Sequence, residues 1–230
     1  MATTEPRVRT DGIPSATVAT PGPRGASAQA PDPRIDEVLA FWFGRAAGDA
    51  GVLASQGARW FARDAEFDAA IRERFAPLRE EAVAGRLDAW LATPRGRLAL
   101  ILLVDQFSRN LFRGDARAFE HDPLARRWSL DGIRAGDDRA LRAIERVFFY
   151  LPLEHSESLA DQQRAVPLFA NLRDEAPAAL LGNFAGFLDY AQRHHDVIAR
   201  FGRFPHRNGA LGRASTAEEI AFLAQPGSSF

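Results

Sequence analysis

The stretch LALILLVDQFSRNLFRG, residues 98–114, decides the fold, because it is apolar on nearly every side and then turns polar. Thr93 and Pro94 precede it and Gly114 follows it, which is typical of the start and end of a helix. A helix that is apolar all round is buried among other helices. The sequence therefore predicts a central helix over about 94–113, with polar side chains placed in or beside the core.

The same helix signals recur on both sides of this stretch. Asp32 is a suitable N-cap with Pro33 behind it, and Gly44 can close that helix in the left-handed conformation. Few β-branched residues and no alternating strand pattern occur, so the sequence predicts an all-α domain of about eight helices with antiparallel neighbours. The other helices are expected at 64–84, from Asp122-Pro123 to near Gly136, at 138–150, 156–173 and 175–200, and after Ser215 or Thr216, with Glu218 and Glu219 as capping-box partners.

The first 31 residues differ in composition from the rest of the chain. They are rich in Pro, Gly, Ala, Ser and Thr and show no apolar period. Such a segment cannot bury enough surface to offset its ordering entropy. The sequence therefore predicts a disordered tail over 1–31 and one domain over 32–230.

Bulk composition excludes several classes of protein. A formal net charge of −1 gives no field that would attract nucleic acid. The longest apolar run, Leu98–Val104, is far shorter than a membrane span, and the N-terminus has no apolar signal-peptide core. The absence of Cys excludes disulfides and thiolate chemistry. We expect a cytoplasmic protein that binds neither nucleic acid nor membrane.

Charged and amide side chains share the central helix with its apolar residues. Asp105 and Arg109 lie one turn apart in the stripe that also carries Leu98, and Gln106 and Asn110 form a second such pair beside them. Leaving one partner of a buried ion pair alone costs roughly 3–5 kcal/mol, so these groups need partners. One interpretation is a structural network that ties the core together. The other is a cleft in which the same four residues bind a polar ligand.

A second polar cluster is FFYLPLEHSESLADQ, residues 148–162. Pro152 is expected to break the preceding helix, which would place Glu154 and His155 at the entry to the next one. A carboxylate beside an imidazole can act as orienter and general base. The alternative is an ordinary helix start, where the helix dipole favours acidic residues.

A third cluster, residues 190–216, ends the long C-terminal helix. His194 lies on its apolar face, as a satisfied core residue would, and His195 lies one position round. The loop that follows is rich in donors near the start of the last helix, where cationic side chains can build an anion site. The candidate ligand-binding and acid–base residues of this cluster are His195, Arg203, His206, Arg207 and Asn208.

No metal or cofactor site is predicted. The histidines and carboxylates would suit zinc or iron chemically, but no H-E-x-x-H or H-x-H spacing occurs. Nucleotide-binding glycine motifs and the G-x-S-x-G nucleophile motif are also absent.

Four stretches together carry a resemblance to a known family. VLAFWFG (38–44), VDQFSRNLFRGDARAF (104–119), residues 148–162 and RFGRFPHRNGALGRASTAEEIAFL (200–223) are similar to the bacterial family catalogued as domain of unknown function 924. The resemblance implies a tetratricopeptide-like, right-handed stack of antiparallel helices over residues 34–230 and implies no activity. Ser108 stands where the family pattern has Pro, which should smooth the helix there.

Two hypotheses of function follow. In the first, the three clusters meet in a pocket that binds a small, polar, anionic ligand. If this pocket is catalytic, hydrolysis is the favoured class, with His155, Glu154 or His206 as acid–base groups and Arg109 or Arg203 holding an oxyanion. In the second, the polar residues only hold the helices of the core together, and the protein is a non-catalytic interaction module with a protein partner.

Overall fold

The 98–114 stretch is buried along most of its length in the computed structural model, which describes residues 1–2 and 32–228. Every side chain from Leu98 to Asp105 is buried. The tail expected over 1–31 lies, apart from its first two residues, outside the described residues. The expected central helix is confirmed.

The all-α prediction is confirmed for the described part of the chain, which holds helices and no strand. If α4 and α5 are joined, it holds nine α-helices, one more than about eight, because α2 was not expected from the sequence. No helix there is both long and apolar enough to cross a membrane. The α-helices are α1 (Pro33–Phe43), α2 (Asp49–Trp60), α3 (Ala65–Val83), α4 (Pro94–Ile101), α5 (Phe107–Leu111), α6 (Asp122–Ala135), α7 (Ala143–Glu154), α8 (Leu159–Asp174), α9 (Leu181–Phe201) and α10 (Ala217–Leu223).

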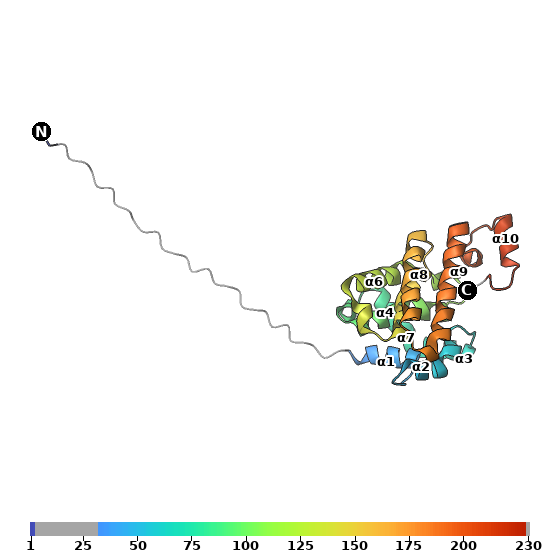
Figure 1. Ribbon diagram of the computed structural model, residues 1–230, viewed down its shortest axis with the longest axis horizontal. Coiled ribbons are helices and arrows are strands. Elements are labelled where there is room, and N and C mark those ends of the chain that lie inside the picture. The colour runs from blue at the N-terminus through green and yellow to red at the C-terminus, as the bar shows by residue number, and fades with distance from the viewer. Residues whose placement is uncertain (3–31, 229–230) are drawn as a thin grey trace. The chain divides into compact units, whose positions relative to one another are not determined.

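Packed pairs of helices build the fold (Figure 1). The chain α6, α7, α8, α9 forms successive packed pairs joined by short connections, so neighbours run antiparallel. Helix α4 contacts α1, α6 and α7 and so lies at the centre. Short 3₁₀ segments make many of the joints: Asp88–Ala92, Ala116–Ala118, Asp137–Ala140, Ala178–Leu180 and Pro205–Arg207. The right-handed tetratricopeptide-like stack stays a prediction.

The helix ends follow the expected caps in most places. The Asp32 carboxylate accepts a hydrogen bond from the Arg34 amide, and Thr216 and Glu219 form a capping box. Gly136 closes α6 in the left-handed conformation, with φ 79°. Gly44 also has a positive φ, but its ψ of −164° lies outside the left-handed helical region, which corrects that detail.

The central helix is regular around Ser108, as expected, because Phe107–Leu111 is α-helical, but it is irregular one turn earlier. Residues Leu102–Gln106, between α4 and α5, form a π-helical turn. Such π turns are rare in proteins overall, and those that occur frequently lie at functional sites. The Arg109 side chain donates from Nη1 to the Asp105 carbonyl oxygen at 2.6 Å, so a side chain supplies part of the bonding at this turn.

Pro152 does not break its helix, contrary to expectation, because α7 continues to Glu154 and His155 caps it. Pro removes one helical donor, and Ser129 Oγ of α6 donates to the nearby Phe149 carbonyl at 2.6 Å. Glu154 and His155 therefore lie at a helix C-terminus rather than at a helix start.

We predict that Gly96→Ala destabilises the fold. A Cβ at Gly96 would lie 2.2 Å from the Trp90 carbonyl oxygen, which is backbone and cannot swing away. Overpacking of this kind costs about 1–3 kcal/mol. Gly186→Ala is the control, because nothing lies within 4 Å of a Cβ there and alanine is the better helix former. Urea unfolding should show a lower free energy of unfolding for Gly96→Ala and none of this loss for Gly186→Ala. Equal stabilities of the two variants would contradict the close packing of α4 against Trp90.

Candidate functional site

Asp105 is the centre of the buried polar network. Its side chain is fully buried, and its carboxylate oxygens lie 2.9 and 3.0 Å from His155 Nδ1 and 3.0 Å from Arg109 Nη1. Gln106 Nε2 donates a further hydrogen bond to it. Burial by itself raises the pKa of this carboxyl, but Arg109 and His155 lower it more, so the net pKa lies below the ordinary value. Asp105 is therefore an ionised carboxylate with three partners.

Asp122, at the start of α6, joins two arginines. Arg109 donates to its two carboxylate oxygens at 3.1 and 3.0 Å, in the forked geometry that guanidinium and carboxylate share. Arg207 Nη1 approaches the same carboxylate at 3.5 Å. Burial lowers the pKa of Arg109, but Asp105 and Asp122 raise it more. Arg109 is therefore held between two carboxylates.

The turn that carries His155 is held from two sides. Gln162, buried in α8, donates from Nε2 to the carbonyl oxygens of Glu154 and Ser156 at 2.6 and 2.7 Å. Glu157 accepts from the Phe204 amide at 2.8 Å and from Arg213 at 2.7 and 2.9 Å. These bonds tie the loop after α9 to the turn between α7 and α8. They explain how segments fifty residues apart meet.

The contact with Asp105 fixes the protonation of the His155 ring. An ionised carboxylate can only accept, so Nδ1 carries the hydrogen and Nε2, on the opposite edge of the ring, is the acceptor. Burial and the charge of Arg109 lower the pKa of His155, outweighing the opposite effect of Asp105. The ring is therefore neutral at neutral pH, and it lines an open groove.

Arg207 is the least satisfied cation of the cluster. It is only 6% exposed, its Nε has no hydrogen-bond partner among the described residues, and its bond to Asp122 is long. Its Cζ lies 4.7 and 4.4 Å from the ring centroids of Phe119 and Phe204. Burial, followed by the charge of Arg109, lowers its pKa to about 10. Aromatic contacts hold the guanidinium while its donors lack good acceptors.

The groove beside these residues has a volume of about 930 Å³. Its walls come from the segment before α6, from α6 itself, from the turn between α7 and α8, and from the loop after α9. The lining residues are Ala116, Arg117, Phe119, Glu120, Asp122, Pro123, Arg126, Pro152, His155, Ser156, Glu157, Ser158, Arg207 and Leu211.

Glu154 and His194 form a second buried pair behind His155. Glu154 Oε1 lies 3.2 Å from His194 Nδ1, which also lies 2.8 Å from the Tyr190 carbonyl oxygen. Burial, and then the negative charge of Asp105, raise the pKa of Glu154 to about 8. Burial, and then His155, lower the pKa of His194 to about 3. Both members are uncharged at neutral pH, and neither lines the groove.

The expected site residues do not all meet. The structure brings together Asp105, Gln106, Arg109, His155 and Arg207, with Glu154 directly behind them. It places four others elsewhere, which corrects the expectation of a single pocket. Asn110 donates to Asp68, His195 faces Asp196, Arg203 pairs with Glu219, and Asn208 donates to Ser215 and Glu219.

His206 is also not placed as an acid–base group of the groove. It lies among buried groups, near the Phe204 ring at 5.6 Å between centroids, and it does not line the groove. Burial, then the charge of Arg207, lower its pKa to about 4. It is therefore uncharged at neutral pH.

Two residues of the site, and one contact behind it, were not expected from the sequence. Asp122 was interpreted only as a helix start, and Phe119 was not singled out, because both depend on contacts with α5 and with the loop after α9. His194 was assigned to the core, and its buried contact with Glu154 needs the packing of α7 against α9. No local sequence signal marks these three pairings.

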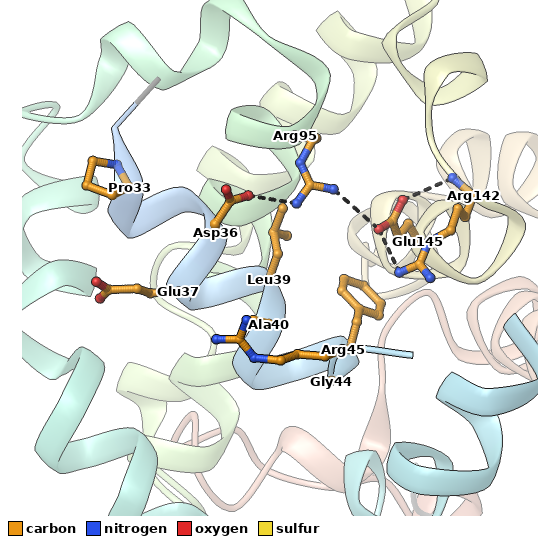
Figure 2. A pocket seen from close by; sticks show the side chains of 11 residues that line it. Pro33, Asp36, Glu37, Leu39, Ala40, Gly44, Arg45, Arg95, Arg142 and Glu145 are labelled. Carbon is orange, nitrogen blue, oxygen red and sulfur yellow. Dashed lines mark hydrogen bonds and ion pairs between the residues drawn. The ribbon is translucent and has the colours of Figure 1, made fainter. Parts of the chain in front are cut away.

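A second cavity, of about 430 Å³, lies between α1 and the start of α7 (Figure 2). Three ion pairs line it: Arg95 lies 2.8 Å from Asp36 and 3.8 Å from the buried Glu145, and Arg142 lies 2.9 Å from Glu145. The exposed pair of Arg95 with Asp36 contributes little to stability. None of the residues expected to carry chemistry lines this cavity.

Comparison with known proteins gives one family and one similar structure. Residues 38–227 match the family model described as bacterial protein of unknown function (DUF924). A solved structure of a protein of unknown function, ATU0120 from Agrobacterium tumefaciens, is 39% identical to the chain. The match covers 84% of this chain and 99% of that one, with a TM-score of 0.71. No curated protein matches the chain.

Proposed function

The chain belongs to the bacterial DUF924 family, whose name assigns no activity, and we propose from the geometry of the groove that it binds a small anion and hydrolyses it. The main support for this proposal is the pair formed by buried Asp105 and His155 beside an open groove. A histidine fixed by a carboxylate through Nδ1 is the usual arrangement of a general base. Arg207 supplies the positive charge for the ligand.

Each residue has a separate role in this proposal. His155 Nε2 takes a proton from a water molecule, whose oxygen bonds to the electrophilic carbon or phosphorus of the ligand. The proton then passes to the leaving group as its bond breaks, which restores the neutral ring. Asp105 is a positioning residue that orients the ring and stabilises the imidazolium. Arg109, expected to hold an oxyanion, is instead occupied by Asp105 and Asp122.

The proposal predicts a defined pH dependence. With mono-p-nitrophenyl glutarate, an anionic ester, kcat/KM should rise with pH through a pKa below the ordinary 6.5 of histidine and level off near neutrality, because the unprotonated ring is the base. His155→Gln should lower kcat/KM about 100-fold or more. His195→Gln is the matched control, because His195 lies outside the groove. Equal rates for the two variants would contradict the role of His155.

The interaction-module hypothesis remains the alternative proposal. Its support is a set of exposed large apolar side chains, Phe61, Leu181, Tyr190 and Ile220. They belong to three different parts of the fold, the end of α2, α9 and α10, and scattered exposed residues are ordinary on protein surfaces. The groove is the better supported site.

A further inference from the structure

We propose that the ligand of the groove is a singly charged carboxylate with an extended apolar body and a hydrolysable ester or amide bond; hexanoate, which lacks that bond, is the probe for its charged head and apolar body. The inference rests on the proposed function for the position of the site and deepens it by naming the ligand class. Three observations carry it: the unsatisfied guanidinium of Arg207, the charge balance of the lining, and the apolar walls.

Arg207 provides the anchor for the anionic head. The other lining arginines already have close carboxylate partners: Arg117 lies 2.9 Å from Asp115, and Arg126 pairs with the buried Asp161. Arg207 has a 3.5 Å contact and a buried Nε without a partner. A planar carboxylate can bind to a guanidinium through two parallel hydrogen bonds. The end of the groove near Arg207 therefore favours a ligand group that accepts hydrogen bonds, such as a carboxylate.

The charge balance of the groove limits the head to one negative charge. With His155 neutral, the lining holds as many arginines as carboxylates. One added anion can pair with Arg207, the lining arginine without a close carboxylate partner, whereas a second negative charge would meet the carboxylates without a further available cation. The residues counted are Arg117, Arg126 and Arg207 against Glu120, Asp122 and Glu157.

Apolar side chains form the rest of the groove. They come from three separate segments, and a groove of about 930 Å³ is far larger than a carboxylate head requires. A ligand with an apolar body would cover this surface and gain from removing it from water. The apolar lining residues are Ala116, Phe119, Pro123, Pro152 and Leu211.

The test is a binding series followed by NMR titration of the full chain at pH 7. Sodium acetate, butyrate and hexanoate should bind with increasing affinity, by about two- to fourfold per methylene. Hexylammonium, with the same body and the opposite charge, should not bind, and hexyl phosphate should bind more weakly than hexanoate. Equal affinities for acetate and hexanoate, tighter binding of hexyl phosphate or hexylammonium, or no binding of hexanoate would overturn the proposal.

Two variants locate the binding. Leu211→Ala should reduce the gain from butyrate to hexanoate, whereas Ile220→Ala on α10, exposed and outside the groove, should leave it unchanged. Arg207→Met should weaken hexanoate at least tenfold, with its fold checked by thermal melting. Hexanoate binding without ester turnover would remove the proposed hydrolysis and keep the ligand class. Ester turnover together with an affinity that does not depend on chain length would keep the proposed hydrolysis and remove the ligand class.

Discussion

Asp105→Ala should cost about 3–5 kcal/mol of folding free energy, the range found when one partner of a buried ion pair is removed. The substitution leaves the His155 ring without its carboxylate partner and Arg109 with Asp122 as its one remaining carboxylate among the described residues. The measurement is urea unfolding at pH 7. Asp36→Ala is the control, because Asp36 pairs with Arg95 on the surface and should cost no more than about 1 kcal/mol. Similar losses for the two variants would show that Asp105 is hydrated.

A large loss at Asp105 does not by itself favour the interaction module. From the sequence, a sealed Asp105–Arg109 pair and a ligand cleft were alternatives. The structure gives Asp105 both properties, since its carboxylate is sealed while its partner His155 lines the groove. One residue can therefore stabilise the fold and orient a reactive ring, and stability alone does not separate the two roles.

Glu154→Gln should change the pH dependence of stability. The folded Glu154 has a pKa of about 8, against 4.5 for an unperturbed glutamate, so between these values the folded state holds a proton that the unfolded state has lost. Its contribution is therefore fully present below about pH 4.5 and declines as pH rises toward 8, by up to about 1.4 kcal/mol per pH unit. The amide of Gln cannot titrate, so the variant lacks this decline.

The measurement is the difference in unfolding free energy between Glu154→Gln and the wild type from pH 5 to pH 8. We expect this difference to move steadily in favour of the variant as pH rises. Comparing the two proteins at each pH cancels the titration of His155, His194 and His206, which acts in the opposite direction below pH 6.5. Glu218→Gln, in a partly exposed pair with Arg200, controls for the loss of a carboxylate. A difference independent of pH would show that Glu154 is ionised throughout.

Local patterns in the sequence predicted most of the fold. Caps at Asp32 and Thr216, and the apolar run before Asp105, depend on a few neighbouring residues and were confirmed. The π turn and the continuation of α7 through Pro152 were not foreseen. Neither a wider turn nor a proline inside a helix is marked by the period of the apolar residues.

The candidate site was predicted less completely than the fold. Asp105 and Arg109 were paired correctly because they are one turn apart on one helix. The position of Arg207 beside His155 depends on Glu157 binding the loop after α9, an interaction between segments 47 and 56 residues apart. The sequence does not distinguish the loop arginines, yet Arg203 and Arg213 have close carboxylate partners and Arg207 has only a 3.5 Å contact with Asp122. Which charged side chains pair over such sequence separations can be seen only in the folded chain.

The most direct test of the central claim is ¹⁵N NMR of the His155 ring, assigned by comparison with His155→Gln. We expect that at pH 7 the ring is neutral, with hydrogen on Nδ1 and none on Nε2, that its pKa lies below 6.5, and that hexanoate raises this pKa. A ring protonated on Nε2, or a pKa at or above 6.5 that hexanoate leaves unchanged, would contradict a general base held by Asp105 beside an anion site.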